Sequence, residues 1–293
     1  MKKALFGTTM ILLATLACGL VTPAPQETQQ GLETIVAATL EAIASEPTPL
    51  SDAAATENQP AQTLEQLTPD GTPFNSTEVS FFIPNGVAND AVSGMTTNVE
   101  YPYINPGGGD MPQHLVIDLN LYAATGSTFS PRIMIFRADE YSQYSDLTAG
   151  IINALQTLQY AEGQTLPQEL DADFMAQIHG VSFQNGQGVR YISQIFQNFS
   201  PVNNAELFYY YQGVTSDGKY LVQATLPINT AFLPADSNPN SALPTDGIVF
   251  NADDFQGYLS AVAQKLNTTE TYNFNPFIDA LDEMIASMQI TGF

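Results

Sequence analysis

Histidine and cysteine, which often carry nucleophilic or metal chemistry, are sparse in this 293-residue sequence. The two histidines, His114 and His179, lack the spacing that places two imidazoles on one helix face. No Gly-x-Ser-x-Gly motif marks a hydrolase nucleophile, and the single cysteine, Cys18, excludes an internal disulfide or a cysteine-rich zinc site. Gly186-Gln187-Gly188 lacks the third glycine of a dinucleotide-binding loop. We therefore expect no metal site and no cofactor.

Carboxylates are the one reactive group in excess, because 30 Asp and Glu residues stand against 7 Lys and Arg residues. Asp118, Asp139-Glu140 and Asp253-Asp254 are candidates for the acid and base of a glycosidase. However, the sequence has no tryptophan to form a sugar platform, and Asp253-Asp254 also fits an acidic helix start favoured by the helix dipole. We expect a protein without catalysis. A carboxylate-dependent extracytoplasmic hydrolase is the alternative.

One acidic loop invites a test for calcium binding. Residues 236–240, Asp-Ser-Asn-Pro-Asn, begin like an EF-hand loop. Ser241 then stands where glycine is required, and Gly247 stands where the bidentate glutamate belongs. The sequence therefore predicts no EF-hand, and a weak calcium site of another type stays open.

Arg190, Tyr209 and Tyr211 are the candidate ligand-binding residues. Arg190 lies on a predicted strand of a chain with few cations, so it either binds an anionic ligand or forms a structural ion pair. In the Tyr209-Tyr210-Tyr211 run, successive rings of a strand point to opposite faces of the sheet. These rings either form a contact surface or pack in the core.

The charge of the chain limits the classes of partner. The formal net charge is −23, so the surface repels phosphate backbones, and we expect no nucleic-acid partner. Hydrophobic residues make up 44 % of the chain and charged residues only 13 %, which is not the composition of a fully disordered protein. A folded core is therefore expected.

The first 17 residues have the pattern of a signal peptide. Lys2 and Lys3 precede an apolar run over residues 4–17, which is shorter than the ~20 residues needed to span a bilayer. Thr15-Leu16-Ala17-Cys18-Gly19 follows and resembles a bacterial lipobox, in which the cysteine is lipidated and becomes the first residue of the mature chain. Thr15 departs from the aliphatic residue that is usual there. The alternative is an ordinary secretory signal in which Cys18 is incidental.

Residues 18–77 are predicted to form an acidic, low-complexity, disordered tether. Pro, Thr, Gln and Ala dominate, and Phe74 is the only aromatic residue, so the segment has too little apolar surface to offset the entropy of ordering. Within it, residues 29–45 have apolar positions near helical spacing. They form either a partner-binding helix or a marginal helix in a linker.

Residues 78–293 are predicted to form a single globular α+β domain, with a mainly antiparallel sheet flanked by helices. Ser216-Asp217-Gly218 is a hairpin turn signal between the last two strands, and Asn275 before Pro276 has the pattern of a helix start. Strands are expected at 79–84, 114–122, 132–137, 188–196, 206–214 and 219–226, and helices at 139–160, 166–178, 253–266 and 276–288.

Two resemblances follow from short motifs. Phe81-Phe82-Ile83-Pro84, Ala224-Thr225-Leu226-Pro227 and Ser287-Met288-Gln289-Ile290 occur in an order that loosely resembles the PsbP/Mog1-like sandwich. Residues 183–190 and 210–220 resemble a family of bacterial envelope lipoproteins without an assigned activity. The second resemblance implies a location and no chemistry.

Together these patterns predict an uncharacterised extracytoplasmic lipoprotein of the bacterial cell envelope. Its partner would be the membrane, through the lipid on Cys18, and its folded part would bind a protein or a small-molecule ligand. Besides the hydrolase, an accessory subunit of an envelope complex is an alternative that the PsbP-like resemblance favours.

Overall fold

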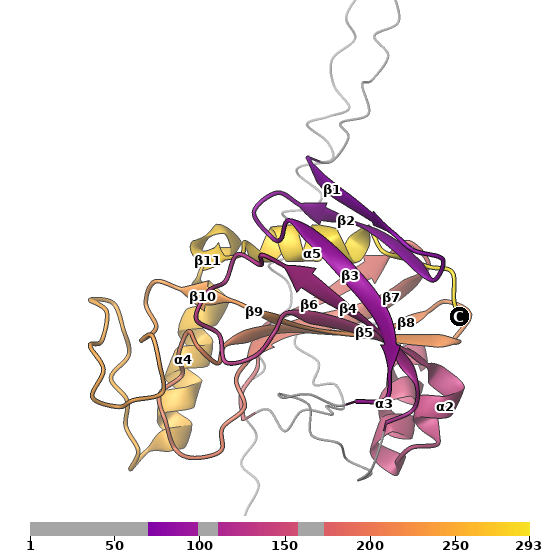
Figure 1. Cartoon of the computed structure of the whole chain (residues 1–293). Helices are drawn as coiled ribbons and strands as arrows, with labels where there is room; N and C mark the ends of the chain where they lie inside the picture. The colour runs from indigo at the N-terminus through magenta and orange to yellow at the C-terminus, as the bar shows by residue number, and fades with distance from the viewer. Residues whose placement is uncertain (1–69, 99–110, 158–172) are drawn as a thin grey trace, which may run out of the picture. The chain divides into compact units, whose positions relative to one another are not determined.

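A seven-stranded antiparallel sheet forms the centre of the protein in the computed structural model, which describes residues 70–98, 111–157 and 173–293 (Figure 1). Its strands lie side by side in the order β3-β4-β5-β9-β8-β7-β6. Their bounds are β3 (Asp90–Thr96), β4 (His114–Asn120), β5 (Arg132–Arg137), β6 (Ala176–Phe183), β7 (Gly186–Ser193), β8 (Phe208–Thr215) and β9 (Tyr220–Pro227).

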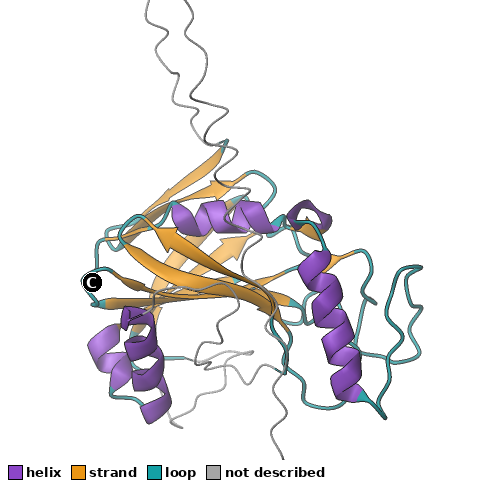
Figure 2. Ribbon diagram, turned by 180° about the vertical axis from the view of Figure 1, so that it is seen from behind, coloured by secondary structure: helices purple, strands orange, loops and turns teal. Residues whose placement is uncertain are grey.

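Further elements cover both faces of this sheet (Figure 2). On one face lie α5 and a small sheet in which β2 runs between β1 and β12, and on the other lie α2 and α3. The predicted α+β class with a mainly antiparallel sheet is confirmed. The bounds are β1 (Gly71–Asn75), β2 (Val79–Pro84), α2 (Ala138–Ser142), α3 (Asp146–Thr157), β10 (Asn229–Thr230), α4 (Phe255–Thr268), the 3-10 turn η1 (Thr271–Asn273), β11 (Phe274–Asn275), α5 (Ile278–Ala286) and β12 (Gln289–Ile290).

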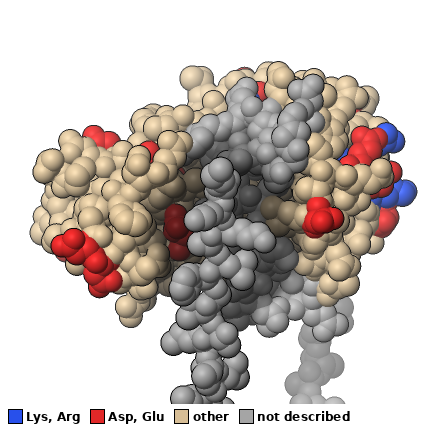
Figure 3. Space-filling view, turned by 90° about the horizontal axis from the view of Figure 1, so that it is seen from below, with Lys and Arg blue, Asp and Glu red and all other residues tan. Residues whose placement is uncertain are grey.

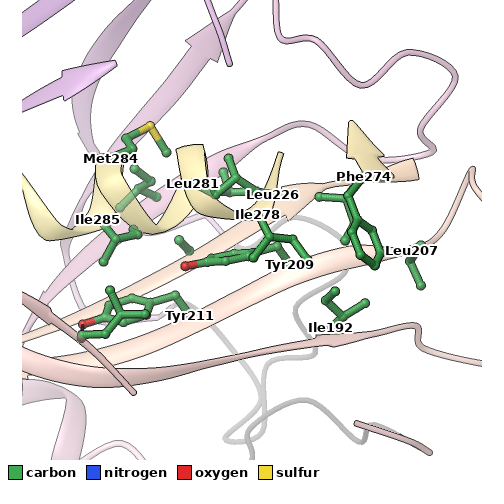
Figure 4. Packing of buried hydrophobic residues seen from close by; sticks show 14 of the residues in the cluster. Ile192, Leu207, Tyr209, Tyr211, Leu226, Phe274, Ile278, Leu281, Met284 and Ile285 are labelled. Atoms are coloured by element: carbon green, nitrogen blue, oxygen red, sulfur yellow. Dashed lines mark hydrogen bonds between the residues drawn. The ribbon is translucent and has the colours of Figure 1, made fainter. Parts of the chain in front are cut away.

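The three tyrosines of β8 show how the sheet supplies two cores. Tyr209 and Tyr211 point toward α5, while Tyr210 points to the opposite face, where α2 and α3 pack. All three side chains are fully buried. Figure 4 shows Tyr209 and Tyr211 beneath the apolar side of α5, which includes Ile278 and Leu281. Each buried aromatic side chain removes roughly 150–250 Å² of surface from water. The tyrosines of β8 therefore stabilise the packing of both layers on the sheet.

The predicted helix over 139–160 is wrong in its extent, because the chain forms two helices there. Three residues separate α2 from α3, and Ser145 is the last of them. Its hydroxyl accepts a hydrogen bond from the Thr148 N–H at 3.1 Å, and the Thr148 hydroxyl accepts one from the Ser145 N–H at 3.1 Å. This reciprocal capping starts a new helix at Asp146. Residues 158–172 lie outside the described part of the chain.

The start of α5 also differs from the prediction. Asn275 does not cap a helix but pairs with Asn229 in the β10-β11 ladder, and Phe277 is the residue before the first helical position. The peptide bond between Asn275 and Pro276 is cis. The preceding helix, expected from residue 253, begins at Phe255. An acid does stand at its start, because the Asp254 carboxylate caps it by accepting a hydrogen bond from the Gly257 N–H at 3.0 Å.

Six strands occur where none was expected: β1, β3, β6 and the two-residue strands β10, β11 and β12. β1 consists of residues 71–75, which the sequence predicts to be part of the tether. β3 lies between the expected strands 79–84 and 114–122. β6 begins at Ala176, within the predicted helix 166–178, most of which lies outside the described residues.

Candidate functional site

Arg190 projects from β7 toward α5, where it forms a buried ion pair. Its side chain is 5 % exposed, and its Nη2 lies 3.2 Å from Oδ2 of Asp282. Nε donates to the same carboxylate at 3.2 Å, and Nη1 donates to the backbone carbonyl of Gln177 on β6. The arginine therefore connects two strands and a helix through one guanidinium group.

Tyr209 and Tyr211 lie on the same face of the sheet as Arg190. The Tyr209 hydroxyl donates to Oδ1 of Asp282 at 2.8 Å, and the Tyr211 hydroxyl donates to the carbonyl of Val181 at 3.1 Å. Burial, and secondarily the Asp282 carboxylate, raise the pKa of both tyrosines well above the ordinary value. Both therefore remain neutral hydrogen-bond donors.

The structure thus brings the three candidate ligand-binding residues together, in the interior beneath α5. Their shared neighbour, Asp282, was not expected from the sequence. One sequence signal could have identified Asp282. It stands four residues after Ile278, next to the apolar positions of a helix that packs on the sheet face to which Arg190 points. A cavity of about 330 Å³ lies above this cluster, lined among others by His179, Asp279 and Asp282.

A bulge in β6 completes this arrangement. Gln177 has a φ of 54°, which is uncommon for a residue other than glycine, and the register of β6 against β7 shifts here. The amide of Gln177 donates to the carbonyls of Leu266 and Thr269, both at 2.9 Å. The bulge therefore caps the end of α4 while its own carbonyl receives the Arg190 guanidinium.

The two histidines lie on different strands, β4 and β6, with four other strands between them in the sheet. His114 is fully buried, stacks on Phe136 with 4.4 Å between ring centroids, and places Nδ1 2.9 Å from the Pro112 carbonyl. Burial, with a smaller contribution from Arg132, lowers the pKa of His114. His179 is exposed. Within residues 70–98, 111–157 and 173–293, no cluster of three His, Cys, Asp or Glu side chains has metal-binding geometry.

Three of the five candidate catalytic carboxylates, all but Asp139 and Asp253, have local structural partners. Asp118 accepts from Arg132 Nε on the neighbouring strand at 2.9 Å, and Glu140 pairs with Arg137 at 3.0 Å. Asp254 caps α4, as described above. These contacts place the three side chains in two ion pairs and a helix cap.

Asp236, the first residue of the calcium-loop candidate, folds back on its own loop. Its Oδ1 accepts from the Ser241 hydroxyl at 2.6 Å and from the Asn238 N–H at 3.0 Å. The hydroxyl of Ser241, and then the N–H of Asn238, lower the pKa of Asp236. Ser241, which stands where an EF-hand requires glycine, thus makes the shortest hydrogen bond to Asp236.

The long segment 231–254, which contains no helix or strand, borders two cavities. Irregular segments of this length in compact domains are commonly functional. The Glu206 pocket, about 590 Å³, is lined by Glu206, Thr128, Ser237 and side chains from residues 195–200. Apart from Ser237, which belongs to the calcium-loop candidate, none of these was expected to belong to a site, because the residues are scattered over the sequence and match no motif.

The Lys265 pocket, about 710 Å³, lies between this segment and the end of α4, and its lining includes Thr230, Phe232, Lys265 and Glu270. The Lys265 ammonium donates to the Asp246 carbonyl and lies 4.7 Å from the centroid of the Phe232 ring. Lys265 is the one cation among the described lining residues of this pocket, and these contacts already engage it in holding the loop to the helix.

Comparison of the chain with family models, with curated proteins and with solved structures found no match. The described residues form an α+β domain with a buried Arg190-Asp282-Tyr209 cluster and two polar cavities beside one long loop. None of the helices described here combines the length and apolarity that crossing a bilayer demands.

Proposed function

We propose that this protein is a lipid-anchored extracytoplasmic binding domain. The observation that carries the anchor is the sequence Thr15-Leu16-Ala17-Cys18-Gly19 behind Lys2, Lys3 and a short apolar run. These residues lie outside the described part of the chain. A lipid anchor suits this chain because its acidic surface would otherwise be repelled by anionic headgroups.

The geometry of the folded part supports binding better than catalysis. Three of the five candidate catalytic carboxylates, Asp118, Glu140 and Asp254, are held in ion pairs or a helix cap. The Glu206 pocket, in contrast, is lined mainly by hydroxyl, amide and apolar side chains with one carboxylate, and the lining of the Lys265 pocket includes hydroxyls together with Asp246, Lys265 and Glu270. Their volumes lie in the range of ~300–1,000 Å³ typical of small-molecule sites. No observation on the described residues favours the hydrolase or the accessory-subunit alternative.

Cys18→Ser tests the anchor. We expect the unaltered protein to fractionate with membranes, to be released by detergent and to have a mass that includes acyl chains. The variant lacks the thiol that accepts the lipid, so we expect it to lack that mass and to leave the membrane fraction.

Thr15→Leu is the matched control, because it restores the aliphatic residue usual at that position and leaves Cys18 in place. It is expected to retain the acyl mass and the membrane fraction. The anchor is refuted if Cys18→Ser still fractionates with membranes and the unaltered protein shows no acyl mass.

A further inference from the structure

We propose that the Glu206 pocket binds a small organic cation, an amine or polyamine, between the Glu206 carboxylate and the exposed ring of Phe199. This inference rests on the proposed binding function and names the ligand class for one of its cavities.

The Glu206 carboxylate is held in place by two buried amides. Nε2 of Gln194 and Nδ2 of Asn203 each donate to Oε2 of Glu206 at 3.0 Å. Gln194 and Asn203 are both 0 % exposed. Two amide donors fix one oxygen of the carboxylate, and Glu206 itself is partly exposed where it lines the pocket. The acceptor is therefore preorganised for a ligand.

The amides are themselves fixed by the backbone. Oε1 of Gln194 accepts from the Asn203 N–H at 2.9 Å, and Oδ1 of Asn203 accepts from the Ala205 N–H at 3.0 Å. Nδ2 of Asn203 also donates to the Pro201 carbonyl at 3.0 Å. Burying two amides is costly unless they are hydrogen-bonded, and here their bonds converge on one carboxylate. Such a network fixes the orientation of the Glu206 carboxylate at the pocket and resists its displacement.

The charge of Glu206 selects for a cation. The amides that hold it are neutral, and no Lys or Arg belongs to the pocket lining that the structure describes. Among the described residues, Glu206 forms no ion pair. An ammonium ligand would supply the missing opposite charge, whereas an anion would meet the carboxylate directly.

Phe199 gives the pocket an aromatic wall. Its side chain is 71 % exposed, and the ring packs against Phe255 with 4.8 Å between centroids. One face of the ring is thus supported from behind while much of its surface faces solvent. Ammonium groups are attracted to the face of an aromatic ring within about 6 Å of its centroid. The hydroxyls of Thr128, Ser200 and Ser237 add acceptors for the remaining N–H groups.

The charge of the whole chain favours the same class of ligand. The net charge is −23, and Figure 3 shows Asp and Glu side chains on several parts of the described surface, with Lys and Arg at one edge of that view. A surface of this sign concentrates cations and repels anions, and salt weakens the effect.

Calorimetric titration of the full chain in detergent tests the proposal, with spermidine and putrescine as cationic probes, maltotriose as a neutral polyol and citrate as an anion. We expect saturable binding of a cationic probe. Glu206→Gln should weaken it at least about tenfold, because the amide keeps the shape of the acceptor and removes its charge. Phe199→Leu should weaken it by roughly two- to fivefold, because the apolar surface remains and the ring is lost.

Glu270→Gln is the matched control, because it removes one negative charge from the Lys265 pocket instead. It should leave the affinity unchanged, and circular dichroism should show that all three variants are folded. Equal weakening by Glu270→Gln and Glu206→Gln would show non-specific attraction to an acidic surface and overturn the proposal.

The remaining outcomes separate the ligand class from the binding function. Saturable binding of maltotriose or citrate alone, lost in Phe199→Leu, would refute the cation and preserve a binding function for the pocket. Saturable binding of none of the four probes would refute the cation and remove the support that this pocket gives to the proposed function.

Discussion

Single residues in this domain act mainly by joining elements. Arg190 was a candidate for binding an anion, and the structure shows its guanidinium engaged by Asp282 and the Gln177 carbonyl. The sequence could identify Arg190 and Tyr209 because arginine and consecutive tyrosines stand out on a strand. It could not identify Asp282, because the partner lies 92 residues away on a helix and only the packing of α5 on the sheet brings it close.

Arg190→Met tests the structural role of this cluster. Removing one partner leaves Asp282 as a largely buried charge without its ion pair, so we expect the free energy of unfolding to fall by about 3–5 kcal/mol. Arg137→Met, which breaks the exposed pair with Glu140, should cost less than about 1 kcal/mol. Urea unfolding measures both. Equal losses in the two variants would show that the buried pair has no special role.

His114 predicts a dependence of stability on pH. Burial lowers the pKa of His114 in the folded state, so below the unfolded value of about 6.5 the unfolded chain binds more protons than the folded chain. Stability is therefore full above that pH and is lost as the pH falls toward the lowered folded-state pKa. Urea midpoints between pH 8 and pH 5 should decline, and His114→Leu should flatten this decline. An unchanged slope in His114→Leu would contradict the prediction.

Secondary-structure elements were predictable where the alternation of apolar and polar residues is regular and a turn motif marks the end of the element. β7, β8 and β9 were expected because their alternation is clear and a Ser-Asp-Gly turn joins the last two. β3 was missed because it is an edge strand whose residues are mostly exposed, so no hydrophobic period marks it. β6 was missed because its bulge at Gln177 interrupts the alternation. The Glu206 pocket escaped prediction for a related reason: its side chains come from loops that only the folded sheet brings together.

The start of α4 provides a prediction at this scale. Asp254→Ala removes the carboxylate that accepts from the Gly257 N–H, and we expect a loss of about 1 kcal/mol in the free energy of unfolding. Asp254→Ser should retain most of the stability, because its hydroxyl can accept the same bond. Asp253→Ala removes the neighbouring acid and no cap, so it should cost only a few tenths of a kcal/mol. Urea unfolding of the three variants decides: a larger loss in Asp253→Ala than in Asp254→Ala would show that charge, rather than capping, matters.

At the scale of the whole molecule, the acidic composition has different meanings in different segments. Eight acids and no Lys or Arg lie in residues 18–77, the segment that the sequence predicts to be a tether. In the domain, all five later basic residues are described and engaged: four in ion pairs, and Lys265 against the Asp246 carbonyl. The charges that remain unbalanced are therefore almost all negative.

The small sheet also ties the order of synthesis to folding. β2, near the beginning of the domain, lies between β1 and β12, which is almost the last segment of the chain. The Ser287 hydroxyl accepts from the Phe82 N–H at 2.9 Å across 205 positions of sequence. Contacts between such distant residues slow folding, because a long loop must close before they form. A chain that emerges amino end first therefore keeps one edge of β2 unpaired until Gln289 and Ile290 have been synthesised.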